Sequence, residues 1–196
     1  MITMKTKNRD QQNGIILNLK ILLLGSLLTA CDNGSQPPQA TATGPSEIET
    51  SGLPSELFVA EPPTDALDVV AARQNAQPGA DIVIQGFVGG RADPFVDGRA
   101  VLTLADAPAL ETCDQNPDDG CQTPWDACCE APAKIKASIA TVQVVDADGN
   151  VLKQGLKGTG GIVEQSMLTI KGLVAAGSSP DSLVVNASKI YVDSTP

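Results

Sequence analysis

Residues 82–88 read Ile-Val-Ile-Gln-Gly-Phe-Val, and residues 168–174 read Leu-Thr-Ile-Lys-Gly-Leu-Val. Both segments follow the pattern apolar-x-Ile-x-Gly-x-Val, so that every second residue is apolar or glycine. Alternation with a period of two is typical of a β-strand that buries one of its faces. A glycine inside a strand often marks a bulge or a sharp bend, which a small barrel needs at its corners. The two segments therefore predict two curved strands of a small barrel.

Three further segments have the composition of strands, and they bring the predicted number of strands to five. They are residues 99–104, 135–145 and 183–192. The segment Asp146-Ala147-Asp148-Gly149-Asn150 predicts a hairpin turn that leads into residues 151–152. The sequence thus predicts a mainly β domain over residues 81–196, with a five-stranded barrel as its core.

A short helix is predicted directly before the first strand, within residues 64–80. Thr64-Asp65 offers an N-cap. Leu67, Val70 and Ala71 follow at the i, i+3, i+4 spacing of one helix face. Because Gln77-Pro78-Gly79 then stops the helix, we expect it over residues 65–76.

The N-terminal residues have the layout of an export signal, in which basic residues precede an apolar run over residues 21–28. Eight residues of helix span about 12 Å, less than a hydrocarbon core of about 30 Å, so a cleaved signal over residues 1–30 is favoured over a membrane span. Residues 28–31, Leu-Thr-Ala-Cys, resemble the lipobox of bacterial lipoproteins. That resemblance implies that Cys31 is acylated and anchors the protein to a membrane of the bacterial cell envelope, where it faces the periplasm.

The segment that follows, residues 31–63, has the composition of a linker. Residues 32–63 contain six prolines and no Lys or Arg. A segment of this kind buries too little apolar surface to offset the entropy lost on ordering. We therefore expect a flexible tether between the lipid anchor and the predicted helix.

Charge and composition narrow the functions that the chain can have. After residue 30 it has nine basic and 22 acidic side chains, a formal net charge of −13. Such a chain repels phosphate backbones and favours cationic partners. Histidine is absent, which excludes Ser-His-Asp and Cys-His catalysis. We expect a protein that is not an enzyme and that carries no cofactor.

The order of export signal, short helix and five strands is similar to that of the bacterial OB-fold (BOF) group of secreted envelope proteins. The resemblance rests on residues 65–76, 82–88, 168–174 and 183–192. It implies a five-stranded Greek-key OB barrel that binds small or cationic ligands rather than nucleic acid. The few aromatic residues agree with that exclusion, because single-stranded nucleic acid binds to basic grooves with aromatic stacking platforms. A cysteine-bearing insert over residues 105–133 sets this chain apart from the group.

The insert holds four cysteines within 17 residues and has no Lys or Arg. Outside the cytoplasm, an even set of cysteines usually forms disulfides. A bridge between the adjacent Cys128 and Cys129 would be strained, which leaves two pairings. These are Cys113–Cys128 with Cys121–Cys129, or Cys113–Cys129 with Cys121–Cys128. The alternatives are a four-thiolate site for zinc or copper(I) and a set of free redox thiols.

Seven acidic residues give the same insert a charge of −7. Trp125 either caps a small core of the insert or stands exposed as a contact anchor. The candidate ligand contacts are Asp114, Asp118, Asp119, Trp125 and Asp126. We expect a membrane-tethered, extracytoplasmic OB-fold binding module, whose disulfide-stapled acidic insert binds a cationic ligand or a basic protein. The alternatives are a thiolate metal-binding or redox protein and a structural envelope lipoprotein.

Overall fold

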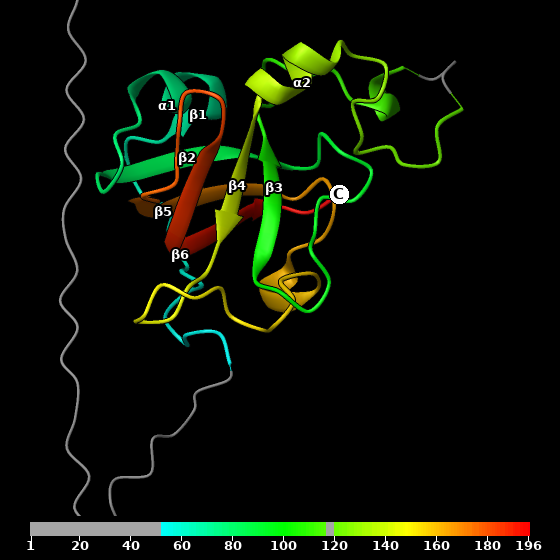
Figure 1. The fold of residues 1–196 in the computed structure, drawn as a ribbon. Coiled ribbons are helices and arrows are strands. Elements are labelled where there is room, and N and C mark those ends of the chain that lie inside the picture. Colours follow the sequence, from blue (N-terminus) through cyan, green and yellow to red (C-terminus); the bar gives the residue numbers. More distant parts are fainter. Residues whose placement is uncertain (1–51, 117–119) are drawn as a thin grey trace, which may run out of the picture. The chain divides into compact units, whose positions relative to one another are not determined.

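A computed structural model describes residues 52–116 and 120–196 (Figure 1). Four predicted features therefore lie outside the described residues. They are the export signal, the lipid anchor at Cys31, the tether as far as residue 51, and the two acids Asp118 and Asp119. Within the described part, no helix is long and apolar enough to span a bilayer.

Five strands close into a barrel, which confirms the predicted mainly β, OB-like fold. They are β2 (Asp81–Val88), β3 (Val101–Ala105), β4 (Ile139–Gln143), β5 (Met167–Val174) and β6 (Leu183–Ser194). Their order is β2-β3-β4-β6-β5, and β5 pairs with β2 to close the cylinder. The β4–β6 pair is parallel, whereas the other four pairs of the barrel are antiparallel. The two segments with the shared pattern are β2 and β5, which lie side by side.

The glycines of β2 and β5 stand where two strands approach closely. A Cβ at Gly86 would collide with the carbonyl oxygen of Ala105 in β3, and one at Gly172 would collide with that of Asn186 in β6. The β5–β6 register also shifts between Lys171 and Gly172, as at a β-bulge. The interior of the barrel is filled by side chains from all five strands. The side chains that are fully buried, with 0% exposure, include Ile84, Val88, Leu102, Leu104, Val142, Leu168, Ile170, Val185 and Ile190.

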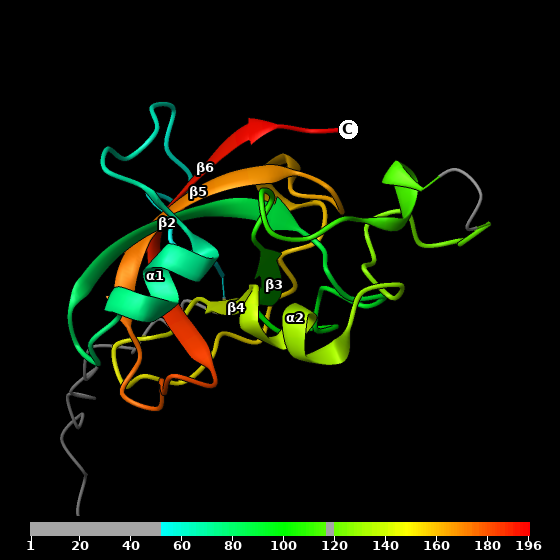
Figure 2. The ribbon, with the colours of Figure 1, turned by 90° about the horizontal axis from the view of Figure 1, so that it is seen from above.

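The helix before the barrel is shorter than predicted. Helix α1 spans Val69–Asn75, and Leu67–Asp68 form a short strand, β1, parallel to β2. The predicted helical start at Asp65 is wrong. Asp65 has a φ of 63°, outside the range of an α-helix, and Leu67 and Asp68 pair with β2 instead of beginning the helix. The buried side chains of α1 are consequently Val69 and Ala72 rather than the predicted stripe. Figures 1 and 2 show α1 at the same end of the barrel as a second helix, α2 (Pro132–Ala137).

Part of the segment assigned to the tether by its composition packs on the barrel instead. The side chain of Leu57 is 1% exposed and belongs to the main core. The backbone amide of Ile190 in β6 donates to the Leu57 carbonyl at 2.7 Å, and Phe58 forms a bridge with Ile190. The packed domain therefore begins well before residue 64.

The remaining differences concern boundaries. The strand predicted over residues 135–145 is shorter, because Pro132 at the first helical position starts α2 and β4 begins only at Ile139. The hairpin turn at residues 146–150 is confirmed by the bridge between Val145 and Val151. Two short 3-10 helices complete the structure, η1 (Cys113–Gln115) in the insert and η2 (Thr159–Gly161) before β5.

Candidate functional site: the cysteine insert

The insert is fastened to the barrel by its own small hydrophobic cluster. Leu110 and Ala127 of the insert are buried against Phe87 of β2 and Ala105 of β3. Asp106, one of the seven acidic residues of the insert, is 2% exposed. Its two carboxylate oxygens accept hydrogen bonds from the amides of Val70 in α1, at 2.8 Å, and Ala109, at 2.9 Å. The start of the insert is therefore tied both to the barrel and to the first turn of α1.

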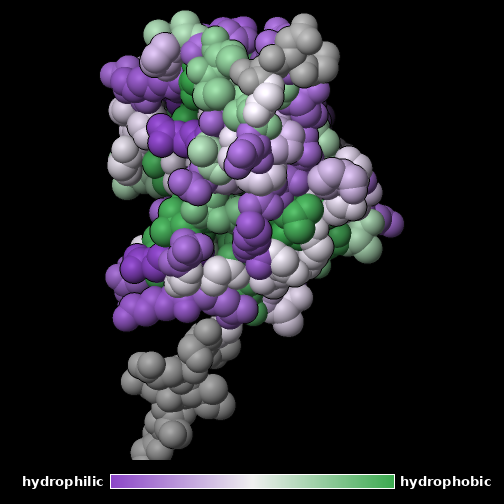
Figure 3. All heavy atoms as spheres, turned by 90° about the vertical axis from the view of Figure 1, so that its right-hand side faces the viewer, coloured by the Kyte–Doolittle hydropathy of each residue, from purple (hydrophilic) through white to green (hydrophobic). Residues whose placement is uncertain are grey.

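Trp125 holds the later part of the insert against the loop between β2 and β3. Its Nε1 donates to the carbonyl of Ala92 at 2.9 Å, and its own carbonyl accepts from the amide of Gly90 at 2.8 Å. The indole thus has a partner within the domain, as a partly buried tryptophan usually does. Figure 3 shows the face of the molecule at the right of Figure 1, where hydrophilic side chains are interspersed with hydrophobic ones.

Backbone hydrogen bonds within the insert bring its cysteines together. The amide of Cys113 donates to the carbonyl of Asp126 at 2.8 Å, and that of Asp114 donates to Pro124 at 3.1 Å. This pairing sets Cys113 against the chain that carries the later cysteines. The Cys128 sulfur lies 3.5 Å from that of Cys113 and 3.9 Å from that of Cys121.

These three sulfurs form one compact group. All of them lie within 4.8 Å of one another, whereas Cys129 is not part of the group. Cys113 is buried, Cys121 is half-buried and Cys128 is exposed. One side of the group is therefore covered by protein and the other faces solvent. An ion from solution has direct access to it.

Hydrogen bonds in this group favour a thiolate. The hydroxyl of Thr123 lies 3.2 Å from the Cys121 sulfur. Hydrogen bonds from the Thr123 side chain and backbone, and then from Cys113, lower the pKa of the Cys121 thiol. Thr123 was not among the residues that the sequence marked as candidates for the site. Its position two residues after a cysteine was the available signal, because a side chain at that distance can reach back to the sulfur.

No disulfide joins the four insert cysteines in the structure. A disulfide needs a sulfur–sulfur distance of about 2.05 Å, whereas the Cys128 sulfur lies 3.5 Å from that of Cys113 and 3.9 Å from that of Cys121. A tetrahedral ion with metal–sulfur bonds of about 2.3 Å sets its sulfur ligands about 3.8 Å apart. The observed separations match that second geometry more closely. Both predicted disulfide pairings remain predictions.

Of the predicted acidic contacts, Asp114 and Asp126 lie in the described part, and each makes hydrogen bonds within the domain. Asp114 accepts hydrogen bonds from the Thr112 hydroxyl and, at 2.8 Å, from Gln165 Nε2. Asp126 accepts from the amide of Ala127 at 2.8 Å. Each carboxylate thus helps to hold its own part of the insert. In residues 52–116 and 120–196, the cysteine trio is the one group of three or more Cys, Asp or Glu that can share an ion.

Comparison with known proteins gives little that bears on this site. No protein-family model matches the chain, and no curated protein matches it. One similar solved structure is described as "OBody AM1L10 bound to hen egg-white lysozyme"; it is 13% identical with a TM-score of 0.37, over 70% of this chain and 100% of the other. Another is "OBody AM3L15 bound to hen egg-white lysozyme", 13% identical with a TM-score of 0.30, over 61% of this chain and 85% of the other. The strand order and pairing, rather than these likenesses, establish the barrel.

Proposed function

We propose that this protein is a lipid-anchored, extracytoplasmic OB-barrel module that binds a soft metal cation through Cys113, Cys121 and Cys128. The observation that carries the proposal is the convergence of these three sulfurs within 4.8 Å. A single disulfide uses two sulfurs of such a group and leaves the third unused. One metal ion engages all three.

The chemistry of the ligands indicates the class of metal. Thiolates are soft donors and favour copper(I) or zinc over calcium and magnesium, which prefer oxygen. Three sulfurs complete a trigonal copper(I) site, or leave the fourth position of a tetrahedral zinc open to a further ligand. The hydrogen bonds on Cys121 lower the pKa of its thiol and so favour the thiolate form that binds a metal.

The charge of the insert supports a cation as its ligand. Residues 105–133 contain no Lys or Arg that would compete for the thiolates. The surrounding carboxylates raise the local concentration of cations and favour their approach. The cationic ligand expected from the acidic composition is in this proposal the metal ion itself. The sulfurs bind the ion. The carboxylates make hydrogen bonds that help to hold the insert, and their negative charge attracts cations.

The lipobox at residues 28–31 supplies the location in this proposal. Acylation of Cys31 would hold the barrel at a membrane of the cell envelope. It would also block the thiol of Cys31, which is the one cysteine of the chain outside the insert. The trio would then meet metal ions in the periplasm, with residues 32–51 as a tether.

One observation favours a second candidate, a binding module stapled by disulfides. The Cys113 and Cys128 sulfurs lie 3.5 Å apart, and they belong to one of the two predicted pairings. Oxidation of this pair, together with Cys121–Cys129, would fix the shape of the acidic insert as a contact surface for a cationic ligand or a basic protein.

Metal content and thiol state decide between the two candidates. The exported chain, with Cys31→Ser to prevent acylation, is purified without oxygen and titrated with copper(I) or zinc against a chelator of known affinity. We expect one ion per chain by native mass spectrometry. Cys128→Ser should weaken its affinity by at least about 100-fold, because it removes the central ligand. Cys129→Ser is the matched control and should retain the ion.

The same preparations give the contradicting outcome. An intact mass lower by about four hydrogens, with no alkylation in the absence of reductant and no retained metal, would overturn the metal proposal and favour the stapled module. Equal metal affinity in Cys128→Ser and Cys129→Ser would also contradict it.

A further inference from the structure

A second feature is a hollow on the outside of the barrel, which we call the basic hollow after its three cations, although the carboxylates of Asp93, Asp126 and Asp181 also line it. Three adjoining cavities make it up, of about 860, 340 and 440 Å³. The first two share Arg73, Lys136 and Asp181 in their walls. The 340 and 440 Å³ cavities share Arg91 and Lys136. Three of the nine Lys and Arg residues after residue 30 thus gather along one hollow in a strongly acidic chain.

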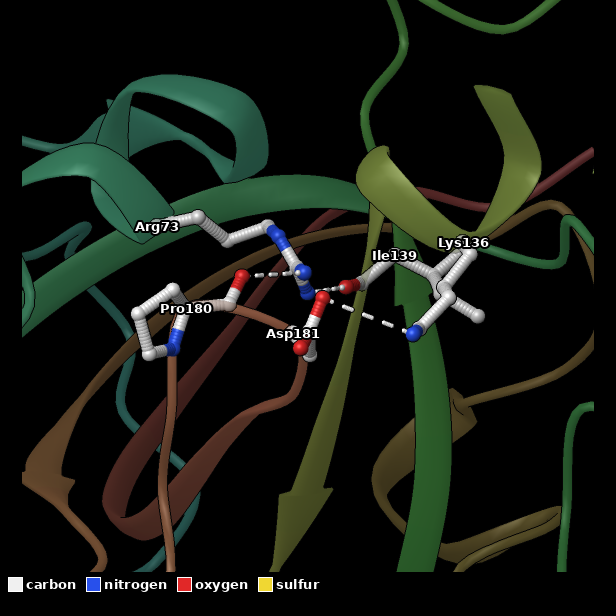
Figure 4. A network of polar contacts seen from close by, with 5 residues as sticks. All are labelled: Arg73, Lys136, Ile139, Pro180 and Asp181. Carbon is white, nitrogen blue, oxygen red and sulfur yellow. Dashed lines mark hydrogen bonds and ion pairs between the residues drawn. The ribbon is translucent and has the colours of Figure 1, made fainter. Parts of the chain in front are cut away.

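Arg73 is held in a fixed orientation by the backbone (Figure 4). Its Nη1 donates to the carbonyl of Ile139 at the start of β4, and its Nη2 to that of Pro180 in the β5–β6 loop, both at 2.9 Å. Partial burial lowers the pKa of this guanidinium, while the nearby Asp181 carboxylate opposes that effect. Two backbone carbonyls position the guanidinium but do not neutralise its charge.

The carboxylate of Asp181 lies between Arg73 and Lys136 (Figure 4). It is 3.5 Å from Lys136 Nζ, and the two side chains are 85% and 63% exposed. A long, exposed ion pair of this kind contributes little to stability and is readily exchanged for another partner. The position of the Asp181 carboxylate therefore shows where an oxyanion can lie between the two cations, and an oxyanion of an external ligand can displace it.

The third cation, Arg91, faces the same hollow with two threonines. The 340 Å³ cavity is lined by Arg91 together with Thr103 of β3 and Thr141 of β4. Among the described residues, the ion pairs are Lys134–Glu130, Lys136–Asp181 and Lys157–Glu164. Neither guanidinium of the hollow belongs to one of these pairs. Planar guanidinium groups with open N–H donors suit bidentate binding of carboxylate or phosphate.

We propose that this hollow binds a small ligand with two or more oxyanion groups, carboxylate or phosphate, held by Arg73, Arg91 and Lys136. One oxyanion takes the place of the Asp181 carboxylate between Arg73 and Lys136, and the other meets Arg91 over the β3–β4 surface. The threonine hydroxyls supply neutral donors beside it.

The lining and the charge of the chain favour a compact anion over a nucleic acid. None of the described residues that line the three cavities is aromatic, so bases have no stacking platform there. A long polyanion also meets the repulsion of an exported chain with a formal net charge of −13, whereas a small ligand contacts only the hollow itself.

The test is calorimetric titration of the exported Cys31→Ser chain at low salt with citrate, pyrophosphate and a short single-stranded DNA. We expect citrate or pyrophosphate to bind, and the difference between them identifies the oxyanion. Lys136→Gln and Arg91→Gln should each weaken binding about tenfold, because each removes a charge-assisted contact. Asp181→Asn should strengthen it about threefold, because it removes the internal competitor.

Two controls make the result specific. Lys171→Gln, an exposed lysine on β5, removes the same charge away from the hollow and should leave affinity unchanged. Cys128→Ser should also bind the anion normally, which separates this site from the cysteine trio. Failure of both anions to bind, equal loss in Lys171→Gln and Lys136→Gln, or tighter binding of the DNA than of either small anion would overturn the proposal.

Discussion

At the scale of single residues, the barrel depends on places where a side chain has no room. Gly86 and Gly172 occupy the same position in the shared pattern of β2 and β5. In each case a Cβ would meet the carbonyl oxygen of a neighbouring strand, Ala105 in one and Asn186 in the other. The sequence indicated that these glycines were structural, because period-two patterning continues on both sides of them. It could not indicate which backbone each one meets, since that depends on the strand order.

This close packing predicts a measurable cost for one methyl group. Gly172→Ala should lower the free energy of unfolding by about 1–3 kcal/mol, because the strands must separate to admit the Cβ. Gly177→Ala in the β5–β6 loop is the matched control: a Cβ there meets nothing within 4 Å. Urea unfolding of the three proteins measures the difference. A Gly172→Ala protein as stable as wild type would contradict the close approach of β5 and β6.

At the scale of elements, the sequence pattern located the strands and turns that depend on local residues, but not the helix boundaries that depend on tertiary contacts. The strands with strong alternation, β2 and β5, were located within a residue or two, and the polar turn before Val151 was recognised from its own composition. The start of α1 was misplaced because a tertiary contact, the pairing of Leu67 and Asp68 with β2, overrides helix propensity there. Helix α2 was missed because its apolar content continues into β4 without a change of composition.

The candidate site shows the same division. The four cysteines and the acidity of the insert were visible in the sequence, so the insert was recognised as special. Which sulfurs meet was not visible, because it depends on the backbone pairing of Cys113 with Asp126. The basic hollow left no local signal. Arg73, Arg91 and Lys136 come from separate parts of the chain, and the fold brings them together.

The docking of the insert predicts a change in its local stability. Trp125→Ala removes the hydrogen bond to Ala92 and the contact of the indole with the β2–β3 loop. Amide hydrogen exchange within residues 107–131 should accelerate by about tenfold or more, corresponding to a loss of about 1–3 kcal/mol in local opening. Exchange in β5 and β6 should stay as in wild type. Unchanged exchange in the insert would instead leave Trp125 available as a contact anchor for a partner.

At the scale of the whole molecule, composition misplaced the boundary of the domain. Residues 32–63 are rich in proline and contain no Lys or Arg, so their overall composition predicts a linker and does not reveal the contribution of Leu57 and Phe58 to the domain. Leu57 completes the core, and the backbone around it pairs with β6 at Ile190. The average composition of a segment does not reveal a single leucine that packs into the core. The core of the barrel is therefore completed by a residue that precedes β2 by more than 20 residues.

A comparison of two chain lengths tests this boundary. A chain that begins at residue 47 should be more stable to urea than one that begins at residue 64, because the shorter chain exposes the core beneath Leu57 and leaves Ile190 without its backbone partners. Leu57→Ala in the longer chain should account for much of that difference, with a loss of about 2–5 kcal/mol. Glu61→Ala, a change at an exposed position of the same segment, should have almost no effect. If the two chains unfold at the same urea concentration, residues 47–63 belong to the tether and the barrel is complete without them.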